Sequence, residues 1–198
     1  MFSAPQERAL HADMRRFLHE DSLFRRATGA VPVDFELRID VEGPGGQRFH
    51  GYVDRVDRDG QGRVWVVDYK TGTKPEKDAP LGGGTLLQLP VYLLSAEGAP
   101  EATALYWYIS TRGGFAQVPY TATAADTAEF ARIVSAMRGG VAAGSFPAVP
   151  GGFNEFYSEF ENCRFCDFTR ICARGRGNDF ARKRADGGVA PWNRVAGA

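Results

Sequence analysis

Two stretches with the composition of β-strands, joined by a tight turn, limit most strongly how this chain can fold. Residues 48–57 and 64–70 are rich in β-branched and aromatic side chains, and residues 59–62, Asp-Gly-Gln-Gly, are typical of a turn. The pattern predicts an antiparallel hairpin. Residues 33–41 alternate strictly between apolar and charged side chains, so we expect a further strand that is buried on one face.

Helical patterns flank these strands. Apolar residues recur at helical spacing in residues 5–27, and further helices are expected at residues 85–97 and 124–141. Residues 102–111 and 115–121 predict a second hairpin. Helices and strands thus alternate within one chain, which predicts an α/β (mixed α+β) fold.

The composition is that of a globular domain. Of 198 residues, 43% are hydrophobic and 24% are charged, and no apolar run is long enough to cross a membrane. Because the N-terminus also lacks the pattern of a signal peptide, we expect a cytoplasmic protein without a membrane partner. Residues 1–145 are expected to form the core, and residues 146–198 an irregular, Cys-rich, basic segment that packs on it.

Two aspartates are expected to face each other across the first hairpin. If the chain turns between Gly60 and Gln61, the numbers of paired residues sum to about 121 or 122, which places Asp54 opposite or next to Asp68. Lys70 lies on the same face as Asp68. Adjacent carboxylates suit Mg²⁺ or Mn²⁺, and a nearby ammonium can stabilise a phosphate, as phosphodiester hydrolysis requires. The alternative is a surface hairpin with solvated or ion-paired side chains.

Three motifs favour the first interpretation. Residues 51–57 (GYVDRVD), 66–72 (VVDYKTG) and 88–92 (QLPVY) resemble, in order and spacing, three motifs of the PD-(D/E)XK nucleases. The match is closest to the RecB-like branch, which includes AddB-type nuclease domains. The resemblance implies a restriction-endonuclease-like core, in which helices flank a mixed central sheet.

The resemblance also implies the role of several residues. Asp54 and Asp68 correspond to metal ligands for Mg²⁺ or Mn²⁺, and the backbone carbonyl of Tyr69 to a further ligand. Lys70 corresponds to the catalytic lysine.

Four other positions match the family less completely or have ordinary alternatives. The resemblance implies that Gln88 and Tyr92, one helical turn apart, support the active site and the DNA backbone, although an amphipathic helix also explains this spacing. Glu36 and His11 are weaker candidates for the metal site. Glu36 could equally be a solvated strand residue. His11 is better explained as a residue on the helix surface, because Glu7 stands where the family's Gly-x-x-x-His motif has glycine.

A cluster of three cysteines, Cys163, Cys166 and Cys172, offers soft ligands for zinc or an iron-sulfur cluster. The spacing resembles the C-terminal part of an iron-sulfur motif in which an earlier cysteine supplies the fourth ligand. Residues 1–162 contain no cysteine, so that ligand would have to be a histidine, an exogenous group or upstream sequence. The chain would then lack N-terminal helices of a longer domain. The alternative is three thiols without a metal.

Basic side chains accumulate around these cysteines. Residues 163–184 contain seven Lys or Arg against two Asp, interspersed with Phe165 and Phe168. Such a patch can bind DNA phosphates and stack on bases, whereas the alternative is a solvated tail. The candidates for DNA binding are Arg164, Arg170, Arg174 and Arg176, together with Gln88 and Tyr92.

These observations predict a Mg²⁺- or Mn²⁺-dependent deoxyribonuclease of RecB-like type. The resemblance implies a role in DNA repair or recombination, exonuclease rather than endonuclease activity, and a helicase subunit or fused helicase domain as partner. One alternative is a non-catalytic DNA-binding or scaffold module, truncated from a larger helicase-nuclease. Another is a structural zinc protein.

Overall fold

A computed structural model describes residues 3–74, 81–84, 86–164, 166–189 and 192. The chain divides into two compact units. The first comprises Met1–Asp78 and Gln88–Thr123, and the second comprises Ala79–Leu87 and Ala124–Ala198. No helix within the described ranges combines the length and the apolar character that crossing a bilayer requires.

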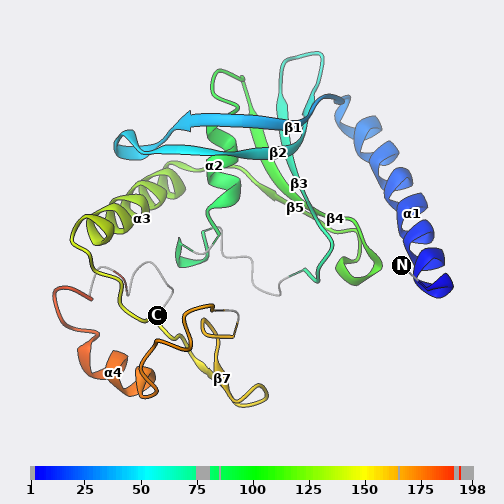
Figure 1. Ribbon diagram of the computed structural model, residues 1–198. Helices are drawn as coiled ribbons and strands as arrows, with labels where there is room; N and C mark the ends of the chain where they lie inside the picture. The colour runs from blue at the N-terminus through cyan, green and yellow to red at the C-terminus, as the bar shows by residue number, and fades with distance from the viewer. Residues whose placement is uncertain (1–2, 75–80, 85, 165, 190–191, 193–198) are drawn as a thin grey trace. The chain divides into compact units, whose positions relative to one another are not determined.

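The first unit is built on a five-stranded sheet in the order β1-β2-β3-β4-β5 (Figure 1). Neighbouring strands are antiparallel except β3 and β4, which are parallel, so the predicted mixed sheet is confirmed. Both predicted hairpins are present. The strands are β1 (Val31–Glu42), β2 (Arg48–Arg58), β3 (Val64–Lys70), β4 (Ala102–Tyr108) and β5 (Gln117–Tyr120), with short 3-10 turns at Pro44–Gly46 and Thr111–Gly113.

Helix α1 (Ala4–Thr28) packs against the sheet and closely matches the predicted helix at residues 5–27. At the start of this helix, the Gln6 side chain accepts a hydrogen bond from the Ser3 N–H at 2.8 Å. Gly29, with a φ of 71°, ends the helix in the left-handed conformation that glycine adopts readily. On the inner face, Phe24 joins a core cluster with the other members Val67, Leu105 and Trp107.

Strand β1 departs from the expected pattern in its first half. Its residues alternate in sequence, but Phe35 is 64% exposed and Val33 is also exposed, whereas Ile39 is buried. Glu36 has a φ of 48°, which interrupts the regular strand conformation. Because β1 is also an edge strand, sequence alternation alone did not determine which side chains are covered.

Helix α2 (Gln88–Leu94) is shorter than the predicted helix at residues 85–97. The predicted start, Thr85, lies outside the described residues. Pro90 is the third helical residue, a position in the first turn where proline removes no intrahelical hydrogen bond. The helix lies in the connection between β3 and β4, and its buried residues are Leu89, Pro90 and Tyr92.

The second unit contains a long helix and an irregular C-terminal part. Helix α3 (Ala124–Ala142) confirms the helix predicted at residues 124–141, and its buried residues are Phe130, Ile133 and Val134. The remaining elements are short: a 3-10 turn (Gly82–Gly84), β6 (Phe153–Asn154), β7 (Glu159–Phe160) and α4 (Arg176–Lys183).

Candidate active site

Two aspartates lie side by side where β2 and β3 separate. The β2–β3 ladder includes Arg55↔Val67, so paired numbers sum to 122, within the predicted range. Extending this register by one residue pairs Asp54 with Asp68. The Tyr69 N–H donates a hydrogen bond to Asp54 Oδ2 at 2.7 Å, which fixes the Asp54 carboxylate against β3.

The Asp68 carboxylate is buried and has polar neighbours at both of its oxygens. The residue is 3% exposed, and its Oδ1 accepts a hydrogen bond from Gln88 Nε2 at 2.6 Å. Its Oδ2 lies 2.6 Å from Lys70 Nζ but receives no hydrogen bond of regular geometry from the described residues. Burial raises the pKa of Asp68, and the neighbouring charge of Asp54 adds to the rise, while Lys70 opposes it.

Gln88 connects the groups of this site. Its Oε1 accepts a hydrogen bond from Lys70 Nζ at 2.9 Å, and its Nε2 lies 2.8 Å from the Tyr92 hydroxyl. Tyr92 in turn donates to the carbonyl of Tyr52 at 2.8 Å. Since Gln88 and Tyr92 are one turn apart on α2, the helix presents both to the carboxylates.

One aromatic contact was not predicted from the sequence. Tyr106 pairs with Asp68 across the parallel β3–β4 ladder, and Lys70 Nζ lies 4.8 Å from the centre of its ring. Burial, together with the charge of Asp68, raises the pKa of Tyr106 to about 12. The parallel register of β4 was not evident from the sequence, so Tyr106 could not be assigned to the site.

The donor set fits a hard divalent cation. Two carboxylates of like charge repel each other, and a cation between them removes this repulsion. The buried Asp68 Oδ2, which lacks a regular hydrogen bond from the described residues, is an oxygen that a cation can take up. Asp54 and Asp68 could therefore hold Mg²⁺ or Mn²⁺, with the Tyr69 carbonyl as a further oxygen donor.

The weaker candidates do not complete this set. Glu36 lies between residues that pair with Arg55 and Val53, so the register places it opposite Asp54, but it is exposed. His11 is exposed on α1, which packs on the other face of the sheet. No group of three or more His, Cys, Asp or Glu within metal-binding reach occurs in the described part of the chain.

The three cysteines, Cys163, Cys166 and Cys172, lie in the turns that follow β7, each partly buried with a free thiol. The described residues do not bring them together as a set of metal ligands.

The predicted DNA-binding arginines differ in their surroundings. Arg176 forms an ion pair with Glu159 at 2.9 Å, and this hydrogen bond raises the pKa of Arg176. Arg164 lies over the ring of Tyr157, 3.5 Å from its centre.

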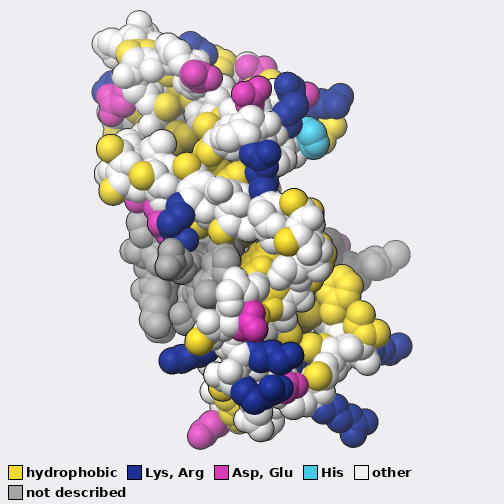
Figure 2. Space-filling view, turned by 90° about the vertical axis from the view of Figure 1, so that its left-hand side faces the viewer, with side chains coloured by type: hydrophobic (Ala, Val, Ile, Leu, Met, Phe, Trp, Pro, Cys, Tyr) yellow, Lys and Arg dark blue, Asp and Glu magenta, His cyan; other side chains and the backbone are white. Residues whose placement is uncertain are grey.

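Arg170 and Arg174 are exposed. Figure 2 shows Lys and Arg side chains scattered among hydrophobic and acidic ones. Phe168 is exposed, and Phe165 lies outside the described residues.

The chain is similar to several known proteins. A model of the PD-(D/E)XK nuclease superfamily matches residues 3–173. The chain is 35% identical over 115 residues to a subunit of the ATP-dependent helicase/deoxyribonuclease of Symbiobacterium thermophilum, a match that covers 48% of this chain and 10% of that protein. It is 32% identical over 151 residues to "Gene 69 protein" of Mycobacterium phage D29, covering 73% of this chain and 48% of that protein.

The chain spans about a tenth and about half of the lengths of these two relatives. Among solved structures, the crystal structure of SSO0001 covers 79% of this chain and 66% of its own, with a TM-score of 0.42 and 18% sequence identity. That likeness is too distant to support a statement about fold or function.

Proposed function

Because this chain belongs to the PD-(D/E)XK nuclease superfamily, we propose that it is a divalent-metal-dependent deoxyribonuclease of RecB-like type. Members of the superfamily generally hydrolyse nucleic acids and generally use divalent metals. The observation that carries the proposal is the cluster of Asp54, Asp68 and Lys70 on one sheet face, with Gln88 hydrogen-bonded to the last two.

Each residue of the cluster has a distinct task in this proposal. Asp54 and Asp68 would hold Mg²⁺ or Mn²⁺, which when bound polarises the phosphate and lowers the pKa of a water molecule. Lys70 has a side chain that is 34% exposed, so its ammonium can contact a phosphate oxygen and stabilise the negative charge that develops there. Gln88 fixes Lys70 relative to Asp68 through one hydrogen bond to each.

The relatives suggest the wider role. One of them is named as a subunit of a helicase and deoxyribonuclease, which supports DNA as the substrate, a helicase as partner and a role in repair or recombination. Exonuclease activity fits this setting better than endonuclease activity. In this proposal residues 1–145 form the catalytic core, and Arg164, Arg170, Arg174 and Arg176 contribute to DNA binding from residues 146–198.

A non-catalytic DNA-binding or scaffold module is the second candidate. It is favoured by one observation: no third His, Cys, Asp or Glu joins Asp54 and Asp68 among the residues described here. Iron and zinc analysis of the purified protein tests the separate prediction that the three cysteines bind a metal.

Cleavage of end-labelled single- and double-stranded DNA distinguishes the two functions. The nuclease proposal predicts degradation with Mg²⁺ or Mn²⁺ and none with a chelator. Labelled ends released first would indicate an exonuclease. DNA binding without cleavage in either metal would support the scaffold module instead.

Replacing Gln88 with alanine is expected to lower the cleavage rate about 10- to 100-fold, the usual effect of losing a group that orients a metal ligand. The reason is that Gln88 is hydrogen-bonded to both Asp68 and Lys70. The rate is measured with saturating Mn²⁺. Gln61→Ala, at an exposed turn position, serves as the control and should cleave like the wild type. Equal rates for Gln88→Ala and the control would exclude this role.

Metal binding should weaken on acidification at a pH above the ordinary range for aspartate. Because the pKa of Asp68 is raised, its carboxylate takes up a proton sooner as the pH falls, and protonation removes the charge that attracts the cation. Titration of the protein with Mn²⁺ at a series of pH values measures this. In Asp68→Asn the remaining pH dependence should shift to more acidic values. An unchanged profile would show that Asp68 does not control binding.

A further inference from the structure

The strands that carry the two carboxylates are not joined by backbone pairing at the site itself. The described β2–β3 ladder runs from Arg58↔Val64 to Arg55↔Val67 and stops one residue before Asp54 and Asp68. Beyond this point β2 pairs with β1, and β3 pairs with β4. Another interaction must therefore set the separation of Asp54 from β3.

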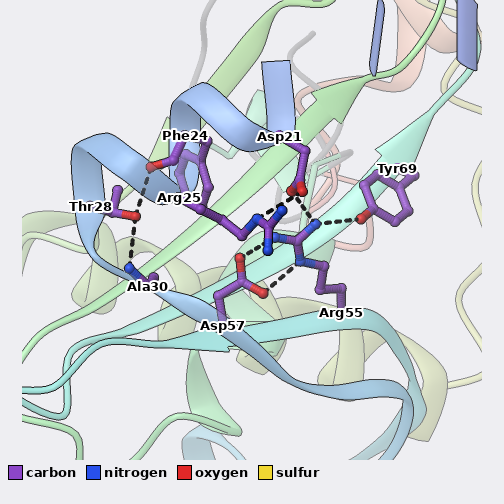
Figure 3. Close-up of polar contacts among 8 residues, drawn as sticks. All are labelled: Asp21, Phe24, Arg25, Thr28, Ala30, Arg55, Asp57 and Tyr69. Atoms are coloured by element: carbon purple, nitrogen blue, oxygen red, sulfur yellow. Dashed lines mark hydrogen bonds and ion pairs between the residues drawn. The ribbon is translucent and has the colours of Figure 1, made fainter. Parts of the chain in front are cut away.

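A buried ionic cluster lies behind this point, on the face that α1 covers (Figure 3). Arg55 is 3% exposed and donates hydrogen bonds to both carboxylate oxygens of Asp57. Its Nη1 donates to Asp21 Oδ1 of α1 at 2.6 Å, and Asp21 also pairs with Arg25 at 3.0 Å. Burial opposes the charge of Arg55, but the hydrogen bonds to Asp57 and Asp21 hold the pKa of Arg55 above its ordinary value.

Tyr69 links this cluster to the carboxylates on the opposite face. Its hydroxyl accepts a hydrogen bond from Arg55 Nη1 at 3.2 Å, and its backbone N–H donates to Asp54 Oδ2 at 2.7 Å. Its ring packs edge-on against Phe17 of α1. Tyr69 of β3 thus contacts two successive residues of β2, Asp54 and Arg55, where the backbone pairing of the two strands ends.

Stability alone does not account for such a cluster. The cost of removing charges from water offsets much of their attraction, so apolar side chains of similar volume often stabilise a fold equally well. What the cluster adds is a fixed geometry. Arg55 has directional hydrogen bonds to three side chains on three elements, α1, β2 and β3.

On the basis of the proposed function, we propose that Arg55, held by Asp21 and Asp57, is a positioning residue for the metal site. It fixes Tyr69 from behind the sheet, and the Tyr69 amide fixes Asp54. Neither of the two carboxylates belongs to helix α1. The helix then supports the geometry of the site through Asp21.

Two conservative variants test this inference. Tyr69→Phe removes only the hydroxyl and keeps the ring, and Asp21→Asn removes one charge from the cluster. The control is Asp59→Asn, which disturbs another buried aspartate, bonded to Arg63 at the far end of the same hairpin. The measurements are amide hydrogen exchange by NMR, the Mn²⁺ dissociation constant and the thermal unfolding temperature.

In both variants the amide of residue 69 should exchange about five- to tenfold faster than in the wild type, relative to the other amides of β3. The Mn²⁺ dissociation constant should rise by a similar factor, about five- to tenfold. Asp59→Asn should lower the unfolding temperature. It should change neither the exchange rate of residue 69 relative to the other amides of β3 nor the Mn²⁺ dissociation constant, because a general loss of stability affects all amides of β3 together.

The inference would be overturned if the relative amide exchange rate of residue 69 and the Mn²⁺ affinity changed no more in the two variants than in the control. Neither measurement requires DNA cleavage. A wild-type chain that binds Mn²⁺ but does not cleave DNA would refute the proposed nuclease function, and the changes at residue 69 would still support or overturn the positioning role.

Discussion

Replacement of Asp68 with asparagine is expected to lower the rate of DNA cleavage about a thousandfold, or about 4 kcal/mol of transition-state stabilisation. Asparagine has nearly the same shape but no charge, so the site loses one of its two anionic ligands. The hydrogen bond that Gln88 donates to Oδ1 can be kept by the amide oxygen of the asparagine. Cleavage of end-labelled DNA in Mg²⁺ and Mn²⁺ measures the loss.

The same variant should fold at least as stably as the wild type without metal. The pKa of Asp68 is raised, so folding disfavours its charged form. Stability from this group is therefore present at low pH and is lost as the pH rises through the raised pKa; at neutral pH a neutral side chain avoids that loss. Thermal unfolding in a chelator tests the sign. A large fall in unfolding temperature would mean that lost activity reflects misfolding.

Asp59 provides the opposite case on the same hairpin. Burial acts to raise the pKa of Asp59, but hydrogen bonds from Arg63 hold it below its ordinary value, so the ionised form stabilises the fold above that range. Asp59→Asn should therefore lose stability at neutral pH and keep its activity. The pair of variants separates the chemistry of the site from the stability of the hairpin.

Replacement of Lys70 with alanine should reduce cleavage about 100- to 1000-fold, the usual cost of removing a group that stabilises transition-state charge. Folding should be preserved because Lys70 is partly exposed. Its effect on metal binding is the sharper test: Lys70 Nζ lies 2.6 Å from Asp68 Oδ2 and competes with a cation for that oxygen.

The Mn²⁺ dissociation constant of Lys70→Ala should accordingly stay the same or fall, while the cleavage rate collapses. Titration calorimetry and a cleavage assay on one preparation give both values. Lys74→Ala, at an exposed lysine four residues after the end of β3, is the control and should retain cleavage. Weaker Mn²⁺ binding together with slower cleavage would show that Lys70 acts by supporting the metal ligands rather than on the phosphate.

Local patterns were sufficient to predict much of this arrangement. The turn at residues 59–62 fixes which residues face each other, and it predicted the juxtaposition of Asp54 and Asp68. The four-residue spacing of Gln88 and Tyr92 predicted that both lie on one side of a helix. The short helix α2 contains both residues at this spacing.

Interactions between distant segments were not predictable in the same way. Arg55 and Asp57 look like ordinary polar strand residues, yet both are buried, and Asp21, 34 residues before Arg55, pairs with the guanidinium. The exposure of Phe35 depends on β1 being an edge strand with an irregular residue at Glu36. Neither feature has a signature within a short stretch of sequence.

The parallel pairing of β3 with β4 has a consequence for the order in which the site assembles during folding. A hairpin forms from near neighbours, so the two aspartates can meet early. Gln88 lies in the long connection that must close before β4 can pair, and it reaches Asp68 across 20 residues of sequence. A refolding chain should thus regain affinity for Mn²⁺ before it regains cleavage, with the delay set by closure of this connection.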